Sequence, residues 1–346
     1  MNNNHYPYFI DWVLTDRCNL RCRHCRGMSR GELSRERAEA LIKEIVALKP
    51  AWVILEGGEP LLKEDLITLI GLLKQHHLKT YLITNGLLLT PEKIALLKKL
   101  DVRIMLSIDG AHQKTYESIR QGSDFYKVVA AAKACARQGI LEALNFTILK
   151  SNQAEIADII HLAQSIGAPK INFIGLKPCH NYRDELLTSA EYKEAIKTVC
   201  RVAHEVGIEF FFDEPFFWAA VKEWELAVKS PIGNAGIVAP SDTACAFGEY
   251  LFIEPDGTVK PCSFAQLPVG NVNSKPLTEI WQDMLSSPLI NKIKDCKNRT
   301  GQCATCSHLE SCKGCRSRTF AITGGWLASD LACPLAIKSN EEGHLK

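Results

Sequence analysis

"FIDWVLTDRCNLRCRHCR", residues 9–26, joins a short apolar segment to a loop with three cysteines. Branched and aromatic side chains dominate residues 9–15, and this composition indicates a buried β-strand. Cys18, Cys22 and Cys25 follow, with three and then two residues between them. A loop this short can wrap three thiolates around one corner of a metal cluster. The sequence therefore predicts a ligand site at the end of the first strand.

Length and composition limit the classes of protein to consider. The chain has 346 residues, 46% of them hydrophobic, and a net charge of +2. This length suggests roughly two domains, and the balanced charge predicts neither nucleic acid nor a membrane surface as a partner. The first residues, "MNNNHYPYF", lack the pattern of a signal peptide. No apolar run reaches the roughly 18 residues that span a bilayer, so we expect a cytoplasmic protein.

Strand-like and helix-like segments alternate from residue 9 to about 206. Ser34 and Thr90 are expected to cap two of the helices, and Pro91 fits the first position of the second. The predicted strands lie at 9–15, 51–57, 79–86, 102–110, 142–149 and 170–177, and the helices at 34–50, 63–77, 90–100, 124–138, 153–166 and 189–206.

Six strands joined by helical crossovers imply a parallel sheet that is buried on both faces. Six units are too few for a full eight-unit barrel, so the α/β fold is predicted to be a partial barrel or an open doubly wound sheet. In either fold, ligands bind at the carboxyl ends of the strands. The three-cysteine loop falls at that edge.

The regular alternation of strand-like and helix-like segments ends at about residue 206, and the composition changes. The aromatic segment "EFFFDEPFFW" (209–218) is expected either to wall a flat pocket or to pack in the core. A hairpin is predicted at 249–262 with its turn at Asp256-Gly257, and a short helix at 277–285. We expect three parts, with limits at 1–206, 207–240 and 241–340. The third is rich in cysteine and irregular, so bound metal is expected to support its folding.

The fourteen cysteines are placed unevenly, with three at 18–25 and eight at 245–333. In a reducing compartment such clustering favours metal or redox chemistry over disulfides. A 4Fe–4S cluster normally takes four thiolates, so three would leave one iron open. Zinc is the alternative metal. Four arginines, Arg17, Arg21, Arg23 and Arg26, are expected to lower the pKa of the thiols, or else to be solvated loop charges.

The Cys-x₃-Cys-x₂-Cys spacing after a first strand resembles that of the radical S-adenosylmethionine (radical SAM) enzymes. "GGEP" (57–60) follows the second strand and "SIDG" (107–110) the fourth, as in that family. The resemblance implies that the segment with Gly57, Gly58 and Glu59 binds the SAM amino group. It implies contacts to the SAM carboxylate, ribose or adenine from His24, Ser107, Asp109, Arg120, Asn145 and Thr147.

The resemblance also implies a reaction. Cys18, Cys22 and Cys25 would hold a 4Fe–4S cluster whose open iron binds SAM. A reduced cluster would cleave SAM to a 5′-deoxyadenosyl radical that abstracts hydrogen from a small-molecule or peptide substrate. The electron would come from a donor such as flavodoxin or ferredoxin. The sequence assigns no acid or base residue.

The later cysteines resemble the SPASM extension of radical SAM enzymes, which holds two auxiliary 4Fe–4S clusters. A zinc ribbon would separate its two Cys-x₂-Cys units by roughly 15–20 residues rather than five. The implied fold is a partial (β/α)6 TIM barrel followed by a SPASM domain, with three 4Fe–4S clusters in all. The resemblance assigns Cys303, Cys306, Cys312 and Cys333 to the distal cluster and Cys245, Cys262 and Cys315 to the proximal one. The fourth proximal ligand would be Cys296 or another atom, or that position would be open for substrate; Cys296 would otherwise be a spare buried thiol.

The segment 312–333, "CKGCRSRTFAITGGWLASDLAC", resembles the heme-biosynthesis branch of that group, as do 267–272 and 277–281. The resemblance implies tetrapyrrole side-chain modification or decarboxylation. The alternatives are peptide or protein maturation, of the ribosomal-peptide or sulfatase-maturase kind, and a non-catalytic iron–sulfur electron carrier. Cys179 and His180 are expected to form a plain loop or a substrate contact. Cys135 and Cys200 are expected in the core.

Overall fold

A parallel β-sheet forms the centre of the computed structural model, which describes residues 6–27, 30–178, 182–228 and 245–335. Six strands run side by side in the same direction, one at each predicted segment. They are β1 (Phe9–Val13), β3 (Trp52–Glu56), β4 (Thr80–Thr84), β5 (Val102–Ser107), β7 (Leu141–Ile148) and β8 (Lys170–Gly175).

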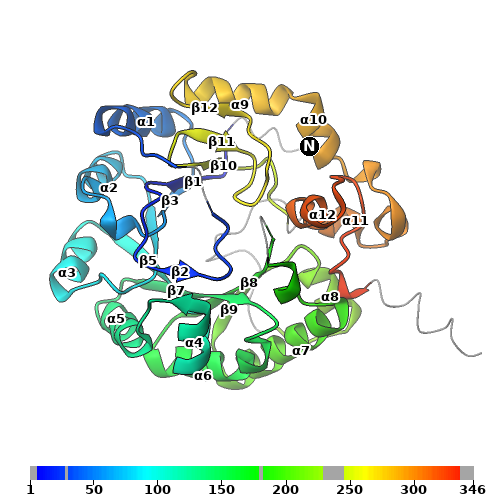
Figure 1. The fold of residues 1–346 in the computed structure, drawn as a ribbon. Helices are drawn as coiled ribbons and strands as arrows, with labels where there is room; N and C mark the ends of the chain where they lie inside the picture. The colour runs from blue at the N-terminus through cyan, green and yellow to red at the C-terminus, as the bar shows by residue number, and fades with distance from the viewer. Residues whose placement is uncertain (1–5, 28–29, 179–181, 229–244, 336–346) are drawn as a thin grey trace, which may run out of the picture.

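Helices cover the outer face of the sheet (Figure 1). All six predicted helices are present, and the side chains of Ser34 and Thr90 accept hydrogen bonds from the first turns of α1 and α3, as expected. The helices are α1 (Arg35–Ala47), α2 (Leu66–Gln75), α3 (Pro91–Lys99), α5 (Phe125–Arg137), α6 (Ile156–Ile166) and α7 (Ser189–Val206), with a short additional helix α4 (Gln113–Ile119).

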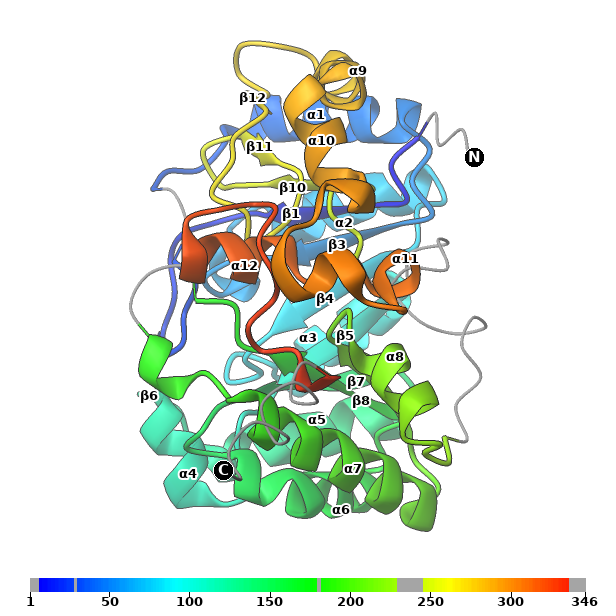
Figure 2. The same cartoon turned by 90° about the vertical axis from the view of Figure 1, so that its right-hand side faces the viewer.

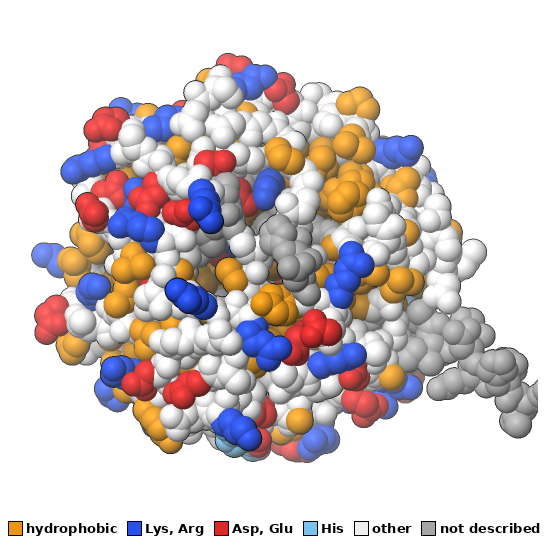
Figure 3. Space-filling view, viewed as in Figure 1, with side chains coloured by type: hydrophobic (Ala, Val, Ile, Leu, Met, Phe, Trp, Pro, Cys, Tyr) orange, Lys and Arg blue, Asp and Glu red, His pale blue; other side chains and the backbone are white. Residues whose placement is uncertain are grey.

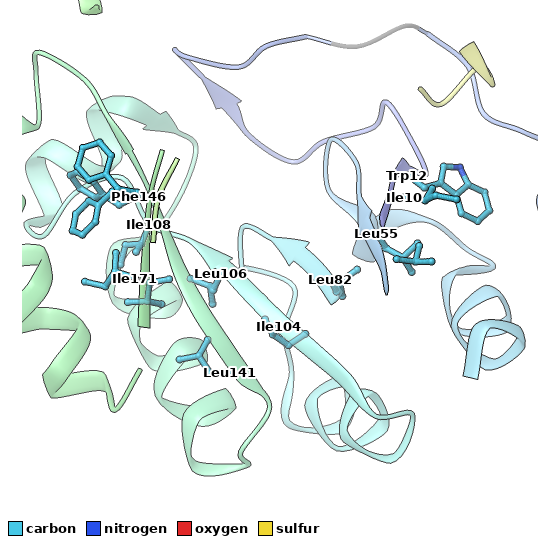
Figure 4. Close-up of a cluster of buried hydrophobic side chains, with 14 of the residues drawn as sticks. Ile10, Trp12, Leu55, Leu82, Ile104, Leu106, Ile108, Leu141, Phe146 and Ile171 are labelled. Carbon is cyan, nitrogen blue, oxygen red and sulfur yellow. The ribbon is translucent and has the colours of Figure 1, made fainter. Parts of the chain in front are cut away.

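Side chains of each strand alternate between two apolar layers. In β1, Ile10 and Trp12 face the helices, whereas Phe9 and Val13 belong to a second cluster on the inner face of the sheet. Figure 4 shows part of the helix-side cluster, drawn from β1 through β8. Asp11 lies between Phe9 and Val13 on the inner face, so it places a carboxyl group inside the curved sheet.

The barrel extends beyond the six predicted units. β9 (Glu209–Asp213) pairs in parallel with β8 and is followed by α8 (Phe217–Glu223). The aromatic segment is therefore a strand and a helix packed in the core, with the rings of Phe212 and Phe217 stacked at 5.0 Å. The expectation of a core role is confirmed, and the strand count of six was too low.

The cysteine-rich part shares the same sheet. The predicted hairpin forms from β10 (Leu251–Ile253) and β11 (Thr258–Lys260), and β10 pairs in parallel with β1. With β12 (Gly270–Asn271), the strand order is β12-β11-β10-β1-β3-β4-β5-β7-β8-β9. The two parts of the chain are thus joined by backbone hydrogen bonds. The domain limits remain a prediction.

Short helices complete the C-terminal part and lie against the barrel opening (Figure 2). They are α9 (Leu277–Ser286), which matches the predicted helix, α10 (Pro288–Lys294), α11 (Leu309–Cys312) and α12 (Arg316–Thr323). Arg37 and Glu44 of α1 bind the backbone of Val272 and Leu277, which fixes α9 against the barrel. Among the described residues, no helix is both long and apolar enough to cross a bilayer.

Candidate functional site

A cavity of about 900 Å³ opens at the carboxyl ends of the parallel strands. This strand-end cavity is lined by residues at the ends of six strands, namely Glu56, Thr84, Ser107, Thr147, Gly175 and Asp213. Figure 3 shows the hollow at the centre of this face, with Lys and Arg side chains around it. The volume is near the upper end of ordinary ligand pockets, roughly 300–1,000 Å³, so the cavity has room for a cofactor together with a substrate.

The three N-terminal cysteines border this cavity. Cys18 and Cys25 are exposed and Cys22 is half-buried in the short strand β2 (Arg21–Cys22), which pairs with β6 (Arg120–Gln121). The backbone N–H of Leu20 donates to Cys18 Sγ at 3.4 Å, and Arg120 Nη1 lies 3.9 Å from Cys22 Sγ. The pairing of β2 with β6 therefore holds the middle thiol beside a buried guanidinium.

At Cys18 and Cys22 the pKa of the thiol is not lowered, contrary to the expectation from the neighbouring arginines. Burial raises the pKa of Cys18 and raises that of Cys22 to about 11. Arg120, which lies far away in sequence, is the cation that acts against this rise. Three of the four nearby arginines are instead paired with carboxylates, in the ion pairs Arg17–Glu32, Arg23–Glu185 and Arg26–Glu56.

The predicted glycine segment forms the wall beside the cysteines. Gly57 and Gly58 line the cavity, and a Cβ on Gly58 would lie 2.7 Å from the carbonyl carbon of Arg17 and 2.8 Å from Cys18 Cβ. Only glycine allows this approach. Glu59 does not line the cavity but is fully buried behind it, where it accepts hydrogen bonds from Thr84 Oγ1 at 2.7 Å and Asn85 N at 2.9 Å. Its role is therefore to fix the turn against β4.

The remaining predicted SAM contacts fall into two layers. Ser107, Asn145 and Thr147 line the cavity together with Arg120 and His24. Asp109 lies behind this wall and is completely buried. It accepts hydrogen bonds from Arg120 Nε at 2.6 Å and Thr147 N at 2.7 Å, and His24 Nε2 lies 3.2 Å away. Burial alone would raise the pKa of Asp109, but Arg120 and His24 hold it well below its usual range.

The residues present fit a 4Fe–4S cluster. Three thiols line one cavity, one of them accepts a backbone N–H, and a buried guanidinium lies near a second. Hydrogen bonds and positive charge at the sulfurs are the features that support such clusters. Among the described residues, no three His, Cys, Asp or Glu side chains converge as they would around one metal ion.

The later cysteines gather in two groups. Burial is the main cause that raises the pKa of Cys312 and Cys333, and Cys303 adds to the rise at both thiols while Cys306 adds to it at Cys333, so these four thiols lie together. In the second group, Cys245 lies near Cys262, whose Sγ is 3.4 Å from Ser317 Oγ. Arg318 N lies 3.5 Å from Cys315 Sγ. Burial lowers the pKa of Arg299 to about 10. The thiols of Cys245, Cys296 and Cys303 act against this shift, so Cys296 lies near Arg299.

Comparison with known proteins agrees with this geometry. The profile of the radical SAM superfamily matches residues 12–163, and that of the SPASM iron–sulfur cluster-binding domain matches residues 245–316. The chain belongs to the radical SAM superfamily. This membership supports the prediction of an enzyme over the alternative of a non-catalytic iron–sulfur electron carrier.

Relatives of this radical SAM enzyme span nearly its whole length. An AdoMet-dependent heme synthase from Methanosarcina barkeri is 28% identical over 338 residues, covering 94% of this chain and 96% of that one. The mycofactocin maturase MftC of Mycobacterium ulcerans is 28% identical over 328 residues, covering 91% and 84%. The structure of Streptococcus suis SuiB bound to S-adenosylmethionine superposes with a TM-score of 0.76 at 17% identity, covering 95% and 77%.

Two buried charge networks of the radical SAM enzyme were not predicted from the sequence. Asp11 shares the inner face of the sheet with Glu56 and Arg26, and burial together with Glu56 raises the pKa of Asp11 well above its usual range. A charged residue inside the apolar segment "FIDWV" was the signal that could have revealed it. This network lies in the wall of the strand-end cavity.

The second network joins the SPASM part to the barrel. Arg318 is fully buried and binds Asp330 Oδ2 at 2.7 Å and Glu214 Oε1 at 2.6 Å. Glu214 directly follows β9 and also accepts from Tyr192 of α7 at 3.2 Å. No local pattern marks this contact, because its partners come from distant segments. Cys135 and Cys200 are buried in α5 and α7, as expected, while Cys179 and His180 lie outside the described residues.

Proposed function

We propose that this radical SAM enzyme cleaves SAM reductively and uses the resulting radical on a tetrapyrrole side chain, by modification or decarboxylation. The observation that carries the proposal is the strand-end cavity, which brings the three-cysteine loop and most of the predicted SAM contacts to one place. The similarity to an AdoMet-dependent heme synthase supports the choice of substrate.

The cavity residues would divide the work of holding the cofactors. We propose that Cys18, Cys22 and Cys25 ligate the catalytic 4Fe–4S cluster and that the backbone at Gly57 and Gly58 binds the SAM amino group. Ser107, Arg120, Asn145 and Thr147 would contact its carboxylate or ribose, and His24 its adenine. Glu59 and Asp109 would act through the neighbours that they hold. When bound, cluster and SAM supply a 5′-deoxyadenosyl radical for hydrogen abstraction.

The SPASM part would add two further 4Fe–4S clusters. We assign Cys303, Cys306, Cys312 and Cys333 to the distal cluster and Cys245, Cys262 and Cys315 to the proximal one. The electrostatic effects of Cys303 on Cys312 and Cys333 and of Cys306 on Cys333 support the distal group. The effect of Cys262 on Cys245, and the 3.4 Å contact of Cys262 Sγ with Ser317 Oγ two residues after Cys315, support the proximal one. A cytoplasmic flavodoxin or ferredoxin would supply the electron.

Peptide maturation is the second candidate function. The similarity to the mycofactocin maturase MftC favours it and extends over 91% of the chain. Both candidates use the same cofactors and differ in the substrate that fills the cavity.

One experiment separates the two functions. The enzyme is reconstituted anaerobically and supplied with SAM and a reductant. Iron–coproporphyrin, siroheme-derived tetrapyrroles and candidate peptides are then compared for stimulated formation of 5′-deoxyadenosine and for a change in substrate mass. Turnover with a tetrapyrrole supports the proposal. Turnover with a peptide alone, or no stimulation by any tetrapyrrole, contradicts it.

A further inference from the structure

We propose that Arg21 and Arg30 bind the propionate carboxylates of the substrate at the mouth of the strand-end cavity. The inference deepens the proposed tetrapyrrole function and rests on it. Both arginines line the cavity and both are exposed. They therefore meet a substrate where it enters, on the side of the cavity that faces solvent.

These two arginines differ from the other cations of the cavity in having no carboxylate partner. Arg23 pairs with Glu185 at 3.5 Å, Lys177 with Asp213 at 2.7 Å, and Arg120 with Asp109 at 2.6 Å, while Arg26 is paired with Glu56. Among the described residues, no acidic side chain forms an ion pair with Arg21 or Arg30. Their guanidinium groups are thus available for an external anion.

The two arginines come from different segments of the rim. Arg21 lies in β2 and is paired across the small sheet with Gln121, which also lines the cavity. Arg30 precedes Gly31, whose Cβ position would lie 3.9 Å from Asp256 Cβ at the turn of the β10–β11 hairpin. One arginine thus sits over the barrel and the other beside the hairpin. This arrangement suits a rigid ligand with carboxylates on more than one edge.

Part of the cavity wall is apolar and complements the two arginines at the mouth. Apolar side chains from the ends of two strands, β4 and β8, and from the SPASM part line it, namely Ile83, Ile174, Leu176 and Phe264. Apolar side chains combined with a few convergent polar groups are usual in a small-molecule site, and guanidinium groups bind carboxylates through paired hydrogen bonds. Asp16 is an opposing carboxylate in the wall. A propionate-bearing macrocycle matches both the apolar part of the wall and the two arginines at the mouth.

Binding of iron–coproporphyrin tests the inference directly. The reconstituted enzyme with SAM is titrated anaerobically, and the Soret absorbance gives the dissociation constant. We compare Arg21→Gln, Arg30→Gln and the double variant with Arg137→Gln, which removes an exposed arginine of α5 outside the cavity. Each cavity substitution should weaken binding about tenfold, since each removes a charge-assisted hydrogen bond. Arg137→Gln should have no effect.

Three further measurements separate the effect of the lost charge from an effect on the structure. The fully methyl-esterified iron–coproporphyrin should bind the wild-type enzyme and the double variant equally weakly. Added salt should weaken wild-type binding of the free acid more than binding by the double variant. Lysine at both positions should restore part of the affinity.

Failure of the inference and failure of the proposed function give different results. If wild type and double variant bind the free acid equally well, the arginine proposal is overturned while the tetrapyrrole function stands. If the fully iron-loaded wild-type enzyme binds no iron–coproporphyrin, both are overturned.

Discussion

Arg120 Nε donates to Asp109 Oδ2 at 2.6 Å, and both side chains are almost completely buried. Asp109 follows β5, and Arg120 follows α4 and belongs to β6. The same carboxylate accepts from the backbone of Thr147 in β7. One buried acid therefore fixes the guanidinium beside Cys22 and joins two strand ends of the cavity wall.

Replacement of Asp109 by Asn should destabilise the enzyme and weaken SAM binding. The substitution leaves Arg120 charged and buried without its counter-ion, and breaking such a pair costs about 3–5 kcal/mol of unfolding free energy. Urea unfolding at pH 7 and equilibrium binding of SAM measure the two effects. Asp158→Asn is the matched control, because it removes a carboxylate from an exposed pair with His112 and should cost less than about 1 kcal/mol.

The unfolding free energy that is lost in Asp109→Asn should depend on pH. The folded protein holds the pKa of Asp109 below its unfolded value of about 3.9, so the aspartate stabilises the fold above that pH. The stabilisation is lost as the pH falls toward the folded pKa. The difference in unfolding free energy between wild type and variant should therefore be full at pH 7 and smaller at pH 3. A difference that grows on acidification would contradict this account.

Gly58→Ala should disturb the three-cysteine loop. The added methyl group would meet the backbone of Arg17 and the Cβ of Cys18, and backbone cannot move aside as a flexible side chain can. We expect less iron at the N-terminal site after reconstitution and a lower unfolding midpoint. Gly71→Ala in α2 provides the control, because apart from its chain neighbours and the backbone of its own helix nothing lies within 4 Å of its Cβ position. Alanine there should stabilise the helix by roughly 0.5–1 kcal/mol.

Cys22→Ala should remove one cluster and abolish SAM cleavage while the two C-terminal clusters remain. Cys22 is the middle thiol of the loop and lies far from the later cysteines in sequence. Iron analysis and electron paramagnetic resonance of the reduced protein measure the loss. Cys135→Ala, in the buried face of α5, should keep the full iron content and the cleavage. Retained 5′-deoxyadenosine formation in Cys22→Ala would overturn the assignment of this loop.

Much of the fold could be predicted because the sequence patterns that indicate its helices and strands are local. Ser34 and Thr90 cap their helices, and each strand of the six predicted units is a short apolar segment next to a turn. β9 was missed because its three consecutive phenylalanines show no alternation, and its pairing with β8 crosses the whole of α7. The pairing of β1 with β10 joins segments about 240 residues apart, so no local pattern announces it.

For the site, too, the sequence predicted the parts that depend on local patterns and missed those that depend on distant contacts. The cysteine spacing and the turns after β3 and β5 are local, and parallel strands bring their ends together. The sequence could not separate Ser107, which lines the cavity, from Asp109, which lies behind it, because that depends on the position of Arg120. Nor could it indicate that burial outweighs the nearby arginines at Cys22, since burial is a property of the whole fold.

Asp330→Asn should loosen the proximal cysteine group. Asp330 binds Arg318 through two hydrogen bonds, at 3.0 and 2.7 Å, and accepts the backbone N–H of Cys315 at 3.0 Å. Its loss leaves the buried Arg318 with Glu214 alone, which should cost about 3 kcal/mol of unfolding free energy. We expect reduced iron at the proximal site with the N-terminal cluster retained, as measured by iron content and paramagnetic resonance. Asp283→Asn, which removes an exposed ion pair with Lys275 in the same part of the chain, should change neither quantity. Equal iron content in the two variants would show that Asp330 does not position Cys315.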